Sequence, residues 1–215
     1  MTDLRIGILG APGSGKTAFS QKLATALRTE RGEVKRQTVR VVDGYINNLV
    51  KKTGYAYGIF ASYPQNMQVL FERWTKEQEA EHAGCEVLIS VGTLYETVLY
   101  HAMKMNSDFV LHPDERALHE KGRTTMETLG AIQSLIATHD LLLFLPYDAK
   151  KLAEKGRSYN TVINEKLPEI VDGYFRPLVP LTGTTKRKVD NALQAIQAVE
   201  RAKAALAAQD QQPSV

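Results

Sequence analysis

Five short runs of apolar and β-branched residues occur along the chain, and segments with helical periodicity separate them. This alternation predicts a mostly parallel sheet covered by helices on both faces, so we expect an α/β fold of three layers (α/β/α) with a five-stranded sheet. Ligands bind such sheets beyond the carboxyl ends of the strands. The predicted strands are Leu4 to Leu9, Val34 to Val42, Cys85 to Val91, Asp140 to Pro146 and Pro177 to Thr182.

Helical periodicity, with apolar residues three and four positions apart, marks the segments between and after these strands. We expect the apolar faces of these helices to cover the sheet. The first helix is predicted over Thr17 to Arg28, and the last carries apolar residues from Val189 to Leu206. Between them, one predicted helix has Met67, Leu70, Phe71 and Trp74 on one face, and two more are predicted over Thr93 to Lys104 and Thr124 to Thr138.

The turn between the first strand and the first helix has the pattern GxxxxGK[ST]. Glycines suit this turn because they accept positive φ and allow a ligand close to the backbone, while the helix N-terminus offers N–H groups and partial positive charge. The pattern predicts a cradle for the phosphates of a nucleoside triphosphate; the alternative is a glycine-rich turn that only caps a helix. Its residues are Gly10, Ala11, Pro12, Gly13, Ser14, Gly15, Lys16 and Thr17.

Two side chains of this loop have distinct predicted roles. Lys16 should contact the β- and γ-phosphates as a point charge and take part in catalysis. The Thr17 hydroxyl should ligate Mg²⁺. The expected cofactors are therefore ATP and Mg²⁺.

The composition is that of one globular domain. The chain has 215 residues, of which 43% are hydrophobic, which is ordinary for a folded protein. We place a single domain at residues 1–206 and a flexible tail at 207–215, because the last residues are small and polar. The longest apolar run, Leu141 to Leu145, is too short to span a bilayer, and the chain shows no signal-peptide pattern. We therefore expect a cytoplasmic protein with no membrane partner.

Charge and cysteine content restrict the function less strongly. A formal net charge of +3 and a pI near 8.9 permit a polyanionic partner such as DNA without requiring one. Cys85 is the only cysteine, which excludes an internal disulfide and a thiolate metal cluster and fits a reducing compartment. The five histidines show no compact metal-binding spacing.

Asp43 ends the second predicted strand and precedes Gly44. A carboxylate at this strand end would face the transferred phosphate, where it could accept a proton from the attacking hydroxyl or hold a Mg²⁺-bound water. Asp43 is thus a candidate for both catalysis and metal binding. The alternative is an ordinary Asp-Gly turn.

Two basic segments follow the fourth and fifth predicted strands. A lid at about residues 147–160 would bring Arg157 onto the transferring phosphate, because the guanidinium fork suits phosphate oxygens. The alternative for this run is a solvated, charged helix face. The loop with Gly183, Thr184 and Lys186 is expected to border the adenine, or else to form only a helix cap and a basic first turn.

The acceptor is expected to bind near the third predicted strand and its preceding helix. Gln68 and Arg73 lie on that helix, and Tyr45 begins a segment rich in glycine, tyrosine and asparagine. Amide and aromatic groups of this kind can hydrogen-bond and stack a base, although ordinary packing also explains them. Residues 45–65 and 106–123 are predicted loops or short helices over the cleft.

These motifs resemble those of the P-loop nucleoside and nucleotide kinases, most closely the ribosylnicotinamide kinase domain of NadR-type proteins. Besides the phosphate loop, the resemblance includes Gln68 with Glu72 on the helix before the third strand, and the fourth strand followed by a basic lid. It also includes the run from Phe175 to Gly183 followed by Lys186 and Arg187. The resemblance implies a P-loop NTPase fold and a phosphomonoester or nucleotide product.

The sequence departs from this family at the end of the third strand. Related kinases often carry an acidic residue there, whereas this chain has Ser90, Val91, Gly92 and Thr93. Either Asp43 takes over the role, as an acidic residue of the second strand does in deoxynucleoside kinases, or catalysis is weakened. Glu96 is a further candidate, although we expect it to lie at the surface.

Three functions remain open from the sequence. The first is an ATP-dependent kinase acting on a nucleoside, nucleotide or related small metabolite. The second is a kinase of hydroxymethylated pyrimidines in DNA, as some bacteriophages use, which would suit the basic pI. The third is an NTP-binding switch or assembly factor with little transferase activity, suggested by the missing carboxylate.

Overall fold

The computed structural model describes residues 2–29, 38–43, 53–54, 63–92, 96, 139–147, 165, 168 and 178–210. Within these ranges the chain alternates strands and helices, as the hydrophobic pattern predicts. The strands are β1 (Leu4–Leu9), β2 (Val39–Val42), β3 (Val87–Val91), β4 (Leu141–Phe144) and β5 (Leu178–Pro180). The principal helices are α1 (Lys16–Arg28), α3 (Tyr63–His82) and α9 (Thr185–Asp210).

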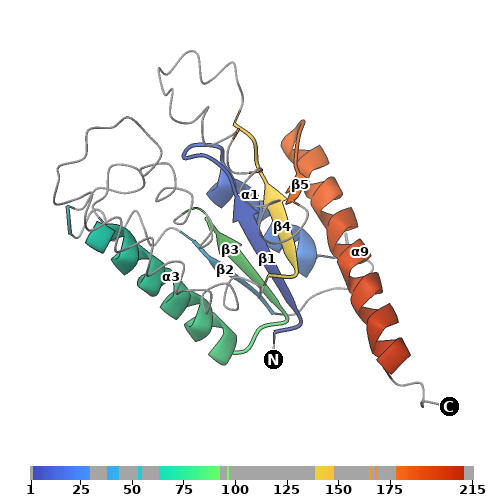
Figure 1. Cartoon of the computed structure of the whole chain (residues 1–215). Helices are drawn as coiled ribbons and strands as arrows, with labels where there is room; N and C mark the ends of the chain where they lie inside the picture. The colour runs from blue at the N-terminus through green and yellow to red at the C-terminus, as the bar shows by residue number, and fades with distance from the viewer. Residues whose placement is uncertain are drawn as a thin grey trace.

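The five strands form one parallel sheet in the order β2-β3-β1-β4-β5. Strand β1 lies in the middle of this sheet, between β3 and β4 (Figure 1). Its residue Ile6 is paired with Ile89 on one side and with Leu141 on the other. The strands read as nearly continuous apolar runs because helices cover both faces of a parallel sheet.

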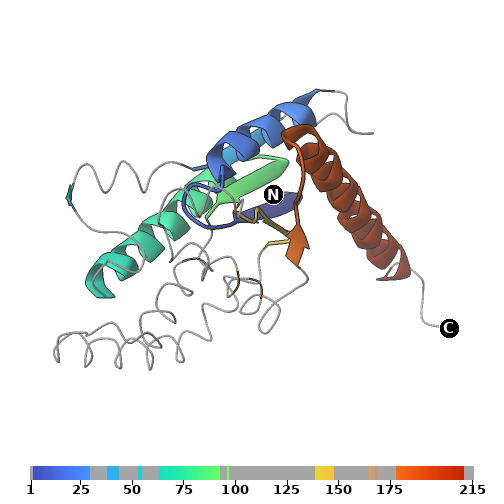
Figure 2. The ribbon, with the colours of Figure 1, turned by 90° about the horizontal axis from the view of Figure 1, so that it is seen from above.

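Helices α1 and α9 cover one face of the sheet and α3 covers the other (Figure 2). The larger core lies under α1 and α9, where Phe19 and Leu23 of α1 meet Ile6 of β1 and Leu193 of α9. A smaller cluster lies under α3 and is made of Ala80, Cys85 and Leu88, with Val42 packed against it. The molecule therefore has the expected three-layer α/β/α architecture.

The predicted strand Leu4 to Leu9 is confirmed to the residue, and the predicted second to fifth strands all contain an observed strand. Helix α9 begins at Thr185 and continues to Asp210, past the domain boundary that we placed at residue 206. The helices predicted over 93–104 and 124–138, and the proposed lid at 147–160, lie almost wholly outside the described residues.

The predicted packing face of α3 is wrong for the two members whose side chains are described. Phe71 is 57% exposed and Trp74 is 39% exposed. The buried side chains of the helix instead include Val69, Arg73, Glu77 and Ala80, which recur at helical spacing and face the sheet. Two charged residues thus occupy the packed face, and a hydrophobic pattern does not detect them.

No helix in the described part of the chain is both long enough and apolar enough to cross a membrane.

Candidate nucleotide-binding site

The loop between β1 and α1 lies at the carboxyl end of the central strand. Gly13 and Gly15 have φ values of 84° and 88°, which L side chains rarely adopt. Gly15 is the N-cap of α1 and, as a glycine, makes no side-chain capping bond to the helix. The first turn of α1 contains no acidic residue. An anion can therefore bind at this helix N-terminus without competition from a capping side chain.

One hydroxyl of the loop is also left without a partner. The Ser14 Oγ atom is buried, and it neither donates nor accepts a hydrogen bond within the described structure. The Ser14 backbone N–H, in contrast, bonds to the Ala11 carbonyl at 3.0 Å. A buried hydroxyl without a partner is costly, and a phosphate oxygen would satisfy it. The loop therefore fits a phosphate group.

Lys16 bends back over the loop from the first turn of α1. Its ammonium donates to the carbonyl oxygens of Gly10 and Ala11, the second at 3.2 Å. It also lies 3.3 Å from Oε1 of Glu96, and its side chain is only 13% exposed. These contacts hold the lysine charge close to the turn at which the phosphates are expected.

Glu96 lies at this site, and the expectation that it is a surface residue is wrong. It is only 2% exposed. Besides its ion pair with Lys16, its Oε1 accepts a hydrogen bond of 3.1 Å from the Gly10 N–H. A carboxylate therefore stands beside the phosphate loop, even though the third strand ends without one.

The other carboxylate oxygen of Glu96 faces the end of β3. A methyl group built on Gly92 would lie 2.7 Å from Glu96 Oε2 and 3.1 Å from Arg73 Nη2. Gly92 has a φ of 64°, so both space and backbone conformation favour glycine there. Arg73 is 2% exposed and reaches this point from α3. The predicted substrate residue Arg73 and the carboxylate of Glu96 thus meet above the same glycine.

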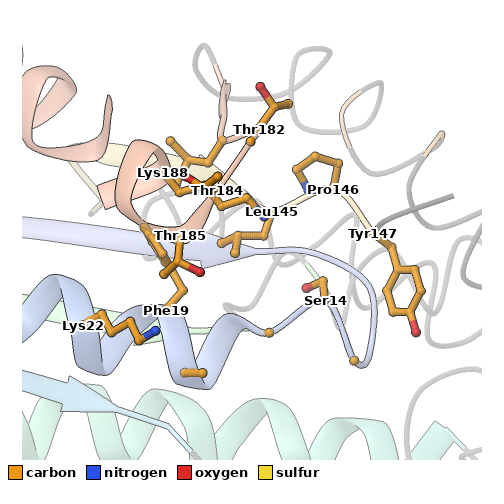
Figure 3. A pocket seen from close by; sticks show the side chains of 15 residues that line it. Ser14, Phe19, Lys22, Leu145, Pro146, Tyr147, Thr182, Thr184, Thr185 and Lys188 are labelled. Carbon is orange, nitrogen blue, oxygen red and sulfur yellow. The ribbon is translucent and has the colours of Figure 1, made fainter. Parts of the chain in front are cut away.

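A cavity of about 600 Å³ adjoins the phosphate loop on the side of β4, away from Gly92 at the end of β3. It lies between the loop, the end of β4 and the turn that leads into α9 (Figure 3). Its described lining contains the cations Lys22 and Lys188 and no acidic residue. The aromatic and apolar lining residues are Ala18, Phe19, Leu145, Pro146, Tyr147 and Leu181. Such a mixture of apolar walls and a few cations suits a nucleobase and its attached phosphates.

The turn before α9 has two structural roles. Thr184 and Gly183 line the cavity, and their predicted contact with adenine stays a prediction. Thr184 also caps α9, because its Oγ1 accepts a hydrogen bond of 3.3 Å from the Arg187 N–H. Lys186 does not line this cavity and instead borders a neighbouring groove between α1 and α9.

Asp43 and Thr17 lie at the ends of neighbouring elements. The Asp43 carboxylate accepts a hydrogen bond of 3.3 Å from Gln21 of α1, and the Thr17 side chain is exposed at the start of that helix. No three His, Cys, Asp or Glu side chains gather as a metal site within the described residues. Mg²⁺ commonly needs only one or two protein ligands beside phosphate oxygens, and metal binding by Thr17 and Asp43 stays a prediction.

The remaining predictions have mixed outcomes. Gln68 is half-buried on α3 and donates to Glu72 at 3.1 Å. Tyr45 and Arg157 lie outside the described residues, and their predicted roles stay predictions. Sequence reasoning missed Lys22, which gives no motif signal because it lies almost two turns inside α1.

Solved structures with the same fold supply the comparison. The NadR protein in complex with NR superimposes with a TM-score of 0.64 at 12% identity; the match covers 92% of this chain and about half, 51%, of the NadR chain. Thymidylate kinase from Candida albicans gives a TM-score of 0.58 at 16% identity, with 93% of each chain covered. The deoxyadenosine kinase of M. mycoides with bound dATP gives a TM-score of 0.57 at 16% identity, and the match covers 90% of this chain and 100% of that one.

The chain has the fold of the P-loop nucleoside and nucleotide kinases. The fold that the sequence resemblance implied is therefore confirmed. No protein-family model and no curated protein matches the chain. The P-loop kinase fold consequently identifies the architecture, while the chemistry has to be argued from this chain's own residues.

Proposed function

We propose that this chain is an ATP-dependent phosphotransferase whose acceptor is a nucleoside, a nucleotide or a related small metabolite. The observation that carries the proposal is the position of Lys16, which stands at the uncapped start of α1 beside a cavity of about 600 Å³. The helix start binds phosphates and the cavity accepts the base. The kinase fold of the solved structures supports the same conclusion.

The donor nucleotide would use the residues of the phosphate loop. The backbone N–H groups of Gly13 to Lys16 would hold the phosphates, and Lys16 would neutralise the charge that develops on the transferred group. Thr17 would hold Mg²⁺, which supplies further charge neutralisation between the phosphates. The base would lie between the apolar residues of β4 and the turn with Gly183 and Thr184.

The acceptor would bind on the α3 side of the carboxyl edge. Arg73 is buried there and would orient an anionic or polar group of the acceptor, with Gln68 one turn earlier on the helix. Asp43 would accept the hydroxyl proton, because it ends the edge strand β2 and lies beside α1. Tyr45 and Arg157 keep their proposed roles as a substrate contact and a lid cation.

Glu96 favours a transferase over an NTP-binding switch. The switch hypothesis was based on the absence of a carboxylate at the end of β3. Glu96 supplies a buried carboxylate within 3.3 Å of Lys16, so the site does contain an acidic group. The proposal that hydroxymethylated DNA is the acceptor has no structural observation in its favour and enters as one arm of the test.

The test is an ADP-release assay with MgATP over a panel of acceptors. The panel contains nucleosides, nucleoside monophosphates, nicotinamide riboside and hydroxymethylated DNA. We expect ADP release with at least one small acceptor and none with that acceptor in the Lys16→Ala variant. If a phosphate group is transferred only to hydroxymethylated DNA, the acceptor is DNA and not a small molecule. Tight ATP binding with no transfer to any acceptor would contradict the proposal and favour the switch.

A further inference from the structure

The ammonium of Lys16 lies against three oxygen atoms: two carbonyls accept hydrogen bonds from it, and a carboxylate forms an ion pair with it. It contacts the carbonyls of Gly10 and Ala11 and the carboxylate of Glu96. A lysine ammonium has three donors and no acceptor. A phosphate oxygen that binds Lys16 directly therefore has to share the ammonium with these three oxygen atoms or replace one of them.

Glu96 is the contact that a phosphate would replace. The carbonyls of Gly10 and Ala11 belong to the backbone of the loop itself, so they move only if the loop moves. Glu96 meets Lys16 through a side chain, at 3.3 Å, and a side chain can turn away without any movement of the loop. The carboxylate is also negatively charged, so a triphosphate arriving at Lys16 repels it.

We infer that Glu96 is a positioning residue for Lys16 which the nucleotide displaces, so that its carboxylate competes with the phosphates for the lysine. This inference rests on the proposed function, because it assigns Glu96 a part in the binding of the donor. In the structure, Glu96 Oε1 neutralises Lys16 and accepts a hydrogen bond from the Gly10 N–H. After nucleotide binding, the bond from Gly10 keeps the carboxylate beside the loop.

The second carboxylate oxygen of Glu96 lies on the side of the site where we propose that the acceptor binds. Glu96 Oε2 and Arg73 Nη2 both lie close to the space above Gly92. When the phosphates take Lys16, the guanidinium of Arg73 remains as a cation beside the carboxylate. Nucleotide binding would therefore strengthen the attraction between Glu96 and Arg73 and fix the Arg73 side chain for the acceptor.

The experiment is calorimetric titration of a non-hydrolysable ATP analogue with Mg²⁺ into the wild type and the Glu96→Gln variant. The amide keeps the size of the side chain and removes its charge. We expect the variant to bind the analogue about tenfold more tightly, equivalent to about 1.4 kcal/mol. We also expect a lower kcat with the best acceptor, because the negative charge near the Arg73 guanidinium is lost. A merely structural role for Glu96 would weaken binding and turnover together.

The matched control for the charge is Glu79→Gln. Glu79 is an exposed residue of α3 that pairs with Lys76 at 2.6 Å, so its variant loses the same charge far from the loop. We expect its affinity for the analogue to stay within about twofold of the wild type. Circular dichroism and thermal unfolding establish that each variant is folded.

A second variant keeps the inference testable if Glu96→Gln does not fold. In Gly92→Ala, the new methyl group would lie 2.7 Å from Glu96 Oε2, so the carboxylate would have to shift from its position beside Lys16. Its control is Gly84→Ala, which has a similar φ of 73° with nothing within 4 Å of the built methyl group. We expect tighter analogue binding in Gly92→Ala and unchanged binding in Gly84→Ala.

Unchanged or weaker binding in a folded Glu96→Gln protein would overturn the inference. The same holds for Gly92→Ala if it alone is folded. The binding assay needs no acceptor, so a failure of the proposed transferase function would be seen separately in the ADP-release panel. Tighter analogue binding with no transfer to any acceptor would support the role of Glu96 while contradicting the kinase proposal.

Discussion

Gly10 packs its Cα atom against the backbone of Leu145. A methyl group built on Gly10 would lie 2.5 Å from the Leu145 carbonyl oxygen and 2.8 Å from Ser14 Oγ. The Leu145 N–H in turn donates to the Leu9 carbonyl at 2.9 Å. The start of the phosphate loop is thus held against the end of β4, with no space for a side chain between them.

The Gly10→Ala variant should therefore be strongly destabilised. Its methyl group meets a backbone carbonyl that cannot move aside, and Gly10 has a φ of 151°. We expect a loss of about 3 kcal/mol or more in the free energy of unfolding, measured by urea denaturation. Gly84→Ala, with positive φ but open space, should lose only about 1 kcal/mol. Equal losses in the two variants would show that the contact with Leu145 has no effect.

Removal of the Lys16 charge should abolish donor binding. At a concentration about a hundred times its dissociation constant, a ligand stabilises the folded state by about 2.7 kcal/mol. We expect MgATP to raise the melting temperature of the wild type and to leave Lys16→Ala unchanged. Lys76→Ala removes an exposed cation of α3 and should respond to MgATP like the wild type. A ligand-induced shift that survives in Lys16→Ala would contradict the proposed phosphate site.

The Asp43→Asn variant should separate chemistry from donor binding. The amide can still pair with Gln21, but it accepts a proton from the attacking hydroxyl far less readily. We expect kcat to fall by about a hundredfold or more while the affinity for ATP stays within about twofold. Asp3→Asn, at an exposed site before β1, is the control. Normal turnover in Asp43→Asn would assign the proton acceptor to another residue.

Arg73 should act on the acceptor. Replacement by Met keeps a long side chain in the buried position and removes the guanidinium. We expect the KM for the acceptor to rise by about tenfold, since hydrogen bonds to charged groups contribute about 1.5–3 kcal/mol. Steady-state kinetics with varied acceptor measures this change. The exposed Arg40 of β2 provides the control variant Arg40→Met, for which an unchanged KM is expected.

The sheet and the phosphate loop could be predicted from the sequence because each has a strong local signal. Strand β1 is an apolar run interrupted by only one charged residue, Arg5, and the glycines and Lys16 follow it directly. The later strands were placed to within a few residues for the same reason. Their ends were less certain, since apolar residues such as Leu145 continue past the last paired position.

Glu96 and the packed face of α3 could not be predicted in the same way. Hydrophobic periodicity assigned Phe71 and Trp74 to the packed face, whereas Arg73 and Glu77 are buried there. Charged residues are almost never fully buried without partners, so a pattern of apolar positions excludes them in advance. The partner of Glu96 is Lys16, which lies far from it in sequence. Only the folded sheet brings the two together.

The central place of β1 has a consequence for protein synthesis. Its partner β4 and the backbone that abuts Gly10 are translated more than a hundred residues after the phosphate loop. A nascent chain that has left the ribosome only as far as β3 therefore lacks one neighbour of β1 and the wall behind Gly10. Such long-range pairing forms late. Nucleotide capture should thus begin only when the fourth strand has emerged.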